Sequence, residues 1–254
     1  MLDWTDRPSF SIELLQLVTP IDCRLTARSQ WMPRGHRSPE EARLETFGPE
    51  TLPNTDTWQT LCKWWLAYER GANTPNWDIV ASCEIEGRPG LILVEAKANV
   101  AELSVAGKRI VPTASPASLA NHHRIGLAID EACAALRQIN SLTAISRDSH
   151  YQLSNRVAFA WKLGSLGVPT ILIYLGFWGD TGIVDAGTPF DSAAHWEVIF
   201  AQHAHSVVPK DLFERRIDCG ASSAWLLVRA RPVLEVSPPT PSKALMDSAA
   251  MPRS

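Results

Sequence analysis

The chain has 254 residues, of which 45% are hydrophobic and 20% are charged, and its formal net charge is −3 at pH 7. A chain of this length can bury a substantial core and needs no disulfide or metal to hold it together. The slightly acidic balance excludes a broadly basic surface, so nucleic acid would have to be bound by a local positive groove.

Five cysteines are scattered through the sequence without a Cys-x-x-Cys pair. An odd number at wide spacing favours reduced, structural thiols and a location in the cytoplasm. The first ten residues, MLDWTDRPSF, lack the basic start and the apolar core of a signal peptide. The longest apolar run, at about residues 171–178, is too short to span a bilayer, so no membrane partner is expected.

The first clear helix signal covers residues 56–69. Two acidic residues flank it, Glu45 before the helix and Glu69 at its end, and a solvated surface position is the simplest interpretation of each. Residues 71–75, Gly-Ala-Asn-Thr-Pro, have the composition of a loop, so the helix is expected to end before them. The apolar residues that recur at helical spacing and predict a core-facing stripe are Trp58, Leu61, Trp65 and Tyr68.

Residues 77–98, WDIVASCEIEGRPGLILVEAKA, predict a β-hairpin. Two apolar runs flank residues 86–90, whose composition is that of a turn. The second run is apolar at both parities and predicts a strand covered on both faces, as in a sheet packed between helices. A loop with an even number of residues would place Asp78 opposite Lys97 or one step beyond it, on the face that also carries Glu95.

The charged residues of this hairpin predict a site. Burying Glu95 and Lys97 is costly unless each finds a partner. With Asp78 they would form two carboxylates and an ammonium group on one face, and Mg²⁺ or Mn²⁺ prefers such hard oxygen ligands. Lys97 would then hold an attacking water and stabilise charge on a phosphate. The alternative is a cross-strand ion pair of Asp78 or Glu95 with Lys97 on a half-exposed sheet face.

An irregular segment, residues 99–118, follows the hairpin. After two expected helices, a buried strand at about residues 170–175 returns to the sheet, which predicts that part of the sheet is parallel. From about Val236 the chain becomes rich in proline and serine, which predicts a disordered tail at residues 236–254. The elements expected between these segments are helices at about residues 119–139, 150–166 and 195–205, and strands at about 170–175 and 224–230.

Gln152 and Arg156 lie four residues apart on the second of these helices and therefore share one flank. A polar pair that borders the core is suited to point into the site, with Arg156 toward a phosphate and Gln152 toward a water or a base. The alternative for both residues is ordinary hydrogen bonding between helices.

Asp78, followed by Glu95-Ala96-Lys97 on the next antiparallel strand, resembles the motif of the PD-(D/E)xK nuclease superfamily. The sequence Asn76-Trp77-Asp78 stands where that family has Pro-Asp, so the proline is absent. The resemblance covers about residues 56–177 as an order of elements. It implies an α/β fold with a mixed central sheet flanked by helices, a restriction-endonuclease-like core, within a single domain over residues 1–235.

The resemblance implies a metal-dependent nuclease that hydrolyses phosphodiester bonds of nucleic acid, with DNA as the expected substrate. A catalytically inactive nuclease-fold protein, acting as a nucleic-acid-binding or assembly module, is the alternative that the acidic balance favours. Oligomeric state, a homodimer included, stays open. The implied site residues are Asp78, Glu95 and the carbonyl of Ala96 as ligands of Mg²⁺ or Mn²⁺, Lys97 as the catalytic lysine, Gln152 and Arg156 as secondary catalytic residues, and Glu45 or Glu69 as an extra acid near the metal.

Overall fold

The computed structural model describes residues 1–47, 52, 55–180, 182 and 187–233, and the predicted tail at 236–254 lies outside the described residues. The strands are β1 (Cys23–Arg24), β2 (Trp31–Met32), β3 (Ile79–Ile85), β4 (Arg88–Lys97), β5 (Thr170–Trp178), β6 (Arg216–Asp218) and β7 (Ser223–Pro232). The α-helices are α1 (Leu2–Thr5), α2 (Phe10–Leu17), α3 (Leu44–Phe47), α4 (Thr55–Trp65), α5 (Pro116–Ile139), α6 (Tyr151–Ser165) and α7 (Ala193–Ala204). Short 3₁₀ helices are η1 (Gly35–Arg37), η3 (Val100–Glu102) and η5 (Lys210–Leu212).

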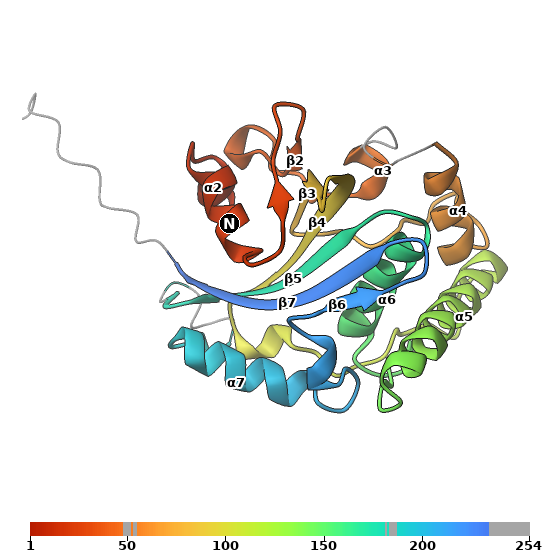
Figure 1. Ribbon diagram of the computed structural model, residues 1–254. Helices are drawn as coiled ribbons and strands as arrows, with labels where there is room; N and C mark the ends of the chain where they lie inside the picture. The colour runs from red at the N-terminus through yellow and green to blue at the C-terminus, as the bar shows by residue number, and fades with distance from the viewer. Residues whose placement is uncertain (48–51, 53–54, 181, 183–186, 234–254) are drawn as a thin grey trace, which may run out of the picture.

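The strands form one mixed sheet in the order β1-β3-β4-β5-β7-β6, with β2 also paired to β3. β3 and β4 are antiparallel, β4, β5 and β7 are parallel, and β6 is antiparallel to β7. The helices α5 and α6 connect β4 to β5, and a connection through helices is what parallel strands require. The prediction of a mixed sheet flanked by helices is therefore confirmed (Figure 1).

The hairpin closes with a two-residue loop, Glu86-Gly87, because Ile85 pairs with Arg88. Both loop residues have positive φ, 51° and 74°, as the tightest hairpin turns require. The predicted even loop is confirmed, but it begins at Glu86, and the last residues of the predicted turn belong to β4. The register consequently carries Asp78 toward Glu95 and not, as expected, toward Lys97 or beyond.

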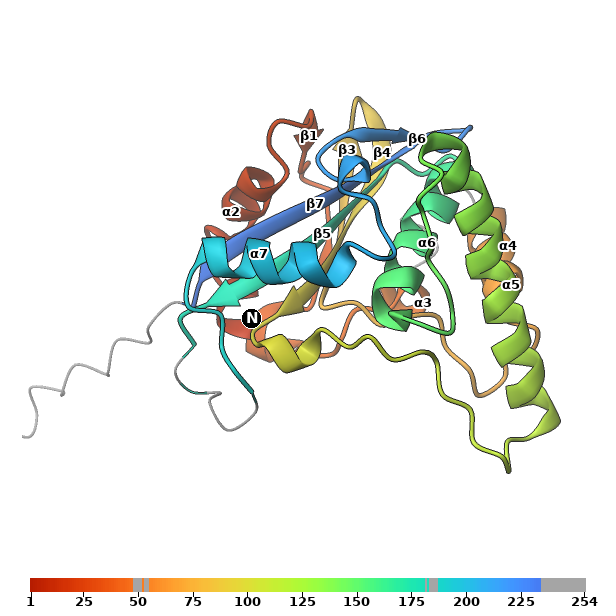
Figure 2. The same cartoon turned by 90° about the horizontal axis from the view of Figure 1, so that it is seen from below.

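Each face of the sheet carries its own apolar core. On one face, Trp4 of α1 and Phe10 and Leu14 of α2 pack against side chains that include Ile92 and Ile173 of the central strands. The other face is covered by α4, α5, α6 and α7. Figures 1 and 2 show this division, with α2 on one side of the strands and α5, α6 and α7 on the other. β4 is thus covered on both faces, as its apolar residues at both parities predict.

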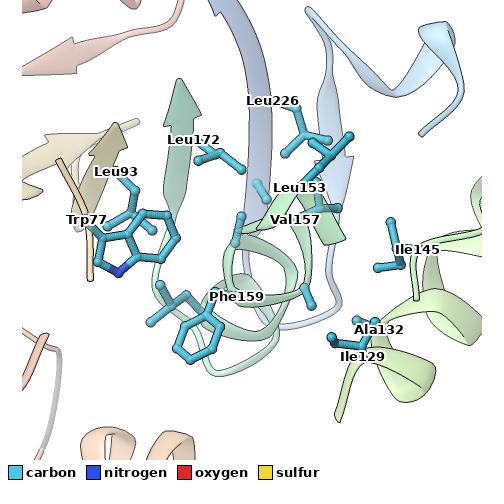
Figure 3. Packing of buried hydrophobic residues seen from close by; sticks show 14 of the residues in the cluster. Trp77, Leu93, Ile129, Ala132, Ile145, Leu153, Val157, Phe159, Leu172 and Leu226 are labelled. Atoms are coloured by element: carbon cyan, nitrogen blue, oxygen red, sulfur yellow. The ribbon is translucent and has the colours of Figure 1, made fainter. Parts of the chain in front are cut away.

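The helix α6 is the link between the sheet and α5. Figure 3 shows Leu153 and Val157 of α6 beside Leu172 and Leu226 of the strands. The residues Ile129 and Ala132 of α5 lie in the same cluster, on the far side of α6. Such close packing fixes the rotation of α6, and with it the direction of the polar side chains on its flank.

Two local predictions are wrong. The helix after residue 55 ends at Trp65 and not at Glu69, so Tyr68 is 56% exposed and is not part of the core-facing stripe. The cause is tertiary, since the Asn121 side chain of α5 accepts hydrogen bonds from the N–H groups of Ala67 and Tyr68 and holds this segment outside the helix.

Within the ranges described above, no helix has the length and apolar character needed to cross a membrane.

Candidate functional site

Glu95 is the centre of a buried charged cluster near the end of β4. Its side chain points to the face covered by α6, and the residue is only 2% exposed. The carboxylate oxygen Oε1 accepts hydrogen bonds from the Lys97 ammonium and, at 2.7 Å, from Nε2 of Gln152. Oε2 accepts from Nε of Arg156 at 2.6 Å. Lys97 is 5% exposed and Arg156 is 7% exposed, so the charges compensate each other in the interior.

Arg156 is held from several directions. Its Nη2 group donates to the carbonyl oxygen of Asn76 at 2.6 Å, and Nη1 donates to the neighbouring Asn155 side chain at 2.8 Å. Its guanidinium carbon lies 4.6 Å from the centre of the Trp77 ring, which is cation–π geometry. Arg156 therefore ties α6 to both strands of the hairpin, through Glu95 and through the residues that precede β3.

Asp78 lies one residue before β3, and its backbone N–H donates to the carbonyl oxygen of Val94 at 3.1 Å. Its carboxylate oxygen Oδ2 accepts the backbone N–H of Ala96 at 2.7 Å, which places the carboxylate between Glu95 and Lys97 along β4. Burial, and next the negative charge of Glu95, raise the pKa of Asp78 to about 6. The three motif residues, which belong to one hairpin, are thus brought together.

A cavity of about 260 Å³ opens beside this cluster, at the carboxyl ends of β4, β5 and β7. Figure 2 shows the amino terminus next to the end of β4, at the same place. The hairpin contributes Asp78, Ala96 and Lys97 to the wall, and other elements contribute Trp4, Phe177 and Arg231. A small molecule in the cavity would therefore meet Asp78 and Lys97.

The sequence-based alternatives are settled in part by this geometry. The alternative ion pair of Glu95 with Lys97 is present, but it runs along one strand and is buried, whereas the alternative placed it across two strands on a half-exposed face. Gln152 and Arg156 both donate to Glu95 of the sheet, and among the described residues neither has a hydrogen bond to another helix. They point into the cluster as the spacing on α6 predicts.

The two additional acids lie elsewhere. Glu45 accepts the backbone N–H of Thr74 at 2.8 Å and its hydroxyl at 2.7 Å, and its Oε2 is buried, so the prediction of a solvated surface residue is wrong. It anchors the loop that leads into β3. Glu69 is exposed after α4, as expected. In the described part of the chain, neither is among the hydrogen-bond partners of Asp78 or Glu95.

Three residues beside the cluster were not predicted from the sequence. Tyr174 of β5 pairs with Glu95 in the parallel register, and its buried hydroxyl has no hydrogen-bond partner among the described residues. Burial, and next the charge of Glu95, raise the pKa of this phenol well above its usual range. His150 and His203 stack with ring centres 4.9 Å apart. Burial, and next the neighbouring His150 and Lys97, lower the pKa of His203 to about 4.

Of these three residues, only His150 can be connected with the site from the sequence, because it lies two residues before Gln152. Tyr174 reads there as one apolar strand residue among others, and His203 as part of an ordinary helix. Their proximity to the cluster depends on the register of β5 and on the docking of α7, which local patterns do not contain.

The donor set is suited to a hard divalent cation. Asp78 and Glu95 supply carboxylate oxygens and Ala96 a backbone carbonyl, which are the ligand types that Mg²⁺ and Mn²⁺ prefer. Burial, and next the repulsion by Glu95, raise the pKa of Asp78, and a bound cation would offset both. No cluster of three or more His, Cys, Asp or Glu residues placed to hold a metal occurs in the described ranges.

Comparison with known proteins adds no relationship. No protein-family model, no curated protein and no solved structure matches this chain. A function therefore has to be argued from the chemistry of the cluster and from the cavity beside it.

Proposed function

We propose that this protein is a hydrolase of phosphodiester bonds in nucleic acid, dependent on Mg²⁺ or Mn²⁺ and built on a restriction-endonuclease-like core. The observation that carries the proposal is the position of the Asp78 carboxylate between Glu95 and Lys97, beside a cavity whose wall includes Asp78 and Lys97. An antiparallel hairpin, a helical connection and a parallel strand, in that order, support the same proposal.

In this proposal Asp78, Glu95 and the Ala96 carbonyl hold the cation, which would supply a Lewis acid for the attack on phosphorus. Lys97 carries a proton and a positive charge at Nζ, where it would orient the attacking water and offset the charge that develops on the phosphate. Arg156 provides a second positive group, already fixed by Asn76 and Trp77. DNA is the proposed substrate.

A second candidate function is nucleic-acid binding or assembly without catalysis. It is favoured by one observation: Lys97, Gln152 and Arg156 already occupy both oxygens of Glu95. The two carboxylates and two cations of the cluster also sum to zero charge, so the cluster is neutral as it stands. In this alternative the charged residues fix the hairpin to α6 and have no role in chemistry.

The deciding experiment is a nuclease assay on supercoiled plasmid and on double- and single-stranded oligonucleotides, with Mg²⁺, with Mn²⁺ and with a chelator. We expect cleavage that needs the metal and that falls by at least about 100-fold in Asp78→Asn and in Lys97→Met. The matched controls are Asp22→Asn and Lys63→Met, which change exposed residues away from the cluster and should cleave like the wild type.

Two outcomes would oppose the proposal. Equal cleavage by Asp78→Asn and the wild type would mean that the activity does not come from this cluster. Binding of the same oligonucleotides without cleavage in either metal would favour the non-catalytic candidate.

A further inference from the structure

A pair of cysteines lies at the opposite end of β3 from Asp78. β1 is an edge strand of only two residues, and its Cys23 pairs with Ile85 of β3. Cys83 is two residues from Ile85 on the same strand, so its side chain leaves the same face of the sheet. Cys23 and Cys83 are therefore diagonal neighbours on one face of the two strands.

The two thiols belong to one apolar cluster, with Cys83 as a buried member and Cys23 packed against it. A hydrogen bond between them lowers the pKa of Cys23, because the Cys83 thiol donates to the Cys23 sulfur and stabilises its thiolate. The same hydrogen bond, together with burial, raises the pKa of Cys83 well above the usual range. Cys83 is 5% exposed in the apolar core under α2, whereas Cys23 is half-buried at the sheet edge.

The other three cysteines provide a contrast within the same chain. Burial raises the pKa of Cys62 and of Cys219 to about 12, and it also raises that of Cys133. Each of these thiols is buried. Thiolate character and access, the two properties that make a cysteine reactive, therefore meet in Cys23.

We propose that Cys23 and Cys83 form an oxidative modification site, at which a hydroperoxide converts the two thiols into a disulfide that joins β1 to β3. The inference goes beyond the proposed hydrolase function and does not depend on it. The edge position of β1 gives the oxidant access, and the brevity of this strand lets it shift by the small distance that bond formation needs.

The chemistry has two steps. The Cys23 thiolate attacks one oxygen of hydrogen peroxide, the O–O bond breaks, and the leaving hydroxide takes up a proton to become water, with Cys23 left as a sulfenic acid. The Cys83 thiol then loses its proton and attacks the Cys23 sulfur. The S–O bond breaks and the hydroxide leaves as water with that proton, so two electrons pass from the thiols to the peroxide.

The test is a titration of the full, reduced chain with hydrogen peroxide, followed by alkylation of the remaining thiols and peptide mass analysis. We expect the five free thiols to fall to three, that is five minus the two that form the disulfide. The Cys23 and Cys83 peptides should appear joined within one chain, lighter by two hydrogen atoms, and dithiothreitol should restore both thiols. A count that stays at five, or a disulfide between two chains, would overturn the proposal.

Two cysteine variants test which thiol the peroxide oxidises first and which thiol then attacks the sulfenic acid. In Cys83→Ser the sulfenic acid of Cys23 should persist and react with dimedone, because its partner thiol is missing. Cys23→Ser should lose the crosslink, whereas the control Cys133→Ser should form it like the wild type. Dimedone labelling of Cys83 and not of Cys23 would contradict the assignment. The wild-type mapping decides the matter even if a variant folds poorly.

Discussion

Glu95 shows how a charged residue is accommodated in an apolar strand. Each of its carboxylate oxygens accepts at least one hydrogen bond from a charged or amide donor, and two of the donors are cations. Taking such groups out of water costs several kcal/mol per ion by the usual order of magnitude, so leucine would be the cheaper residue for stability alone. Perturbed charged clusters beside a cavity are typical of functional sites, which is why we assign a function here.

The first prediction concerns the charge of Glu95. Glu95→Gln keeps the size of the side chain but leaves two buried cations, Lys97 and Arg156, with the Asp78 carboxylate as their one remaining counter-charge in the cluster. We expect the free energy of unfolding in urea to fall by about 3–5 kcal/mol. The control Asp22→Asn, in an exposed pair with Arg24 at 3.9 Å, should change it by less than about 0.5 kcal/mol. Equal effects of the two substitutions would show that the cluster does not depend on this carboxylate.

The second prediction is that a substitution of Asp78 stabilises the protein, whereas the substitution of Glu95 destabilises it. The pKa of Asp78 is raised from its ordinary value of 3.8 to about 6, so the folded protein binds a proton that the unfolded chain has already released. Between these two values the stability contributed by Asp78 falls as the pH rises. Asp78→Asn removes this penalty and can still accept the Ala96 N–H, so we expect it to stabilise the protein at pH 7, by up to about 3 kcal/mol.

The pH dependence provides the control for this prediction. Below about pH 4 Asp78 is protonated in both states, and the advantage of Asp78→Asn should disappear. The measurement is urea unfolding of both proteins from pH 4 to pH 7, in the presence of a chelator. A variant that is less stable than the wild type at pH 7 would show that the ionised carboxylate supports the fold.

At the scale of elements, the site depends on how α7 docks on the sheet. Gly176 of β5 pairs with Lys97 of β4 on one side and with Ala230 of β7 on the other. A Cβ atom at this glycine would lie 2.3 Å from ring atoms of Trp196, a fully buried residue of α7. The absence of a side chain at this position therefore lets α7 approach the strands and cover the cluster.

The third prediction follows from this close approach. Gly176→Ala should force α7 outward and lower the free energy of unfolding by about 1–3 kcal/mol, the usual cost of overpacking. The control Gly182→Ala adds a Cβ whose one near neighbour among the described residues is the Asp180 carboxylate, at 3.3 Å, and it should change the free energy of unfolding by less than about 0.5 kcal/mol. Unchanged stability in Gly176→Ala, measured by urea unfolding, would show that the contact between α7 and β5 adapts freely.

At the scale of the whole molecule, the cavity is built by segments from both ends of the chain. Its wall includes Met1 and Trp4, the end of the hairpin, and Arg231 of β7. Arg231 lies with its guanidinium carbon 4.0 Å from the centre of the Trp4 ring and donates to Glu13 of α2 at 2.7 Å. Because the wall forms only in the folded state, a ligand that binds there must stabilise the fold as a whole.

The fourth prediction uses this linkage. If Mg²⁺ binds at the cluster with a dissociation constant of about 1 mM, then about 10 mM Mg²⁺ should raise the free energy of unfolding by about 1.4 kcal/mol. Asp78→Asn should show no such increase, because it removes a ligand. Potassium chloride at equal ionic strength is the control for screening. The same increase in the wild type and the variant would place the effect elsewhere on the molecule.

The sequence by itself determined the local elements and the candidate residues. The apolar run of β4, the even loop of the hairpin and the shared flank of Gln152 and Arg156 on α6 all follow from side-chain periodicity and turn composition, which act between near neighbours in the chain. The selection of Asp78, Glu95 and Lys97 rests on the same local reasoning, because charges in a covered strand are conspicuous in the sequence.

Only the tertiary structure decided which groups meet. Glu95 is bound by Gln152 and Arg156, 57 and 61 residues further along the chain, and it lies beside Tyr174 of the next strand. The proximity of Cys23 to Cys83 likewise depends on the pairing of β1 with β3. Such contacts come from the packing of elements against one another, and because packing is a property of surfaces brought together by the fold, local sequence patterns do not encode it.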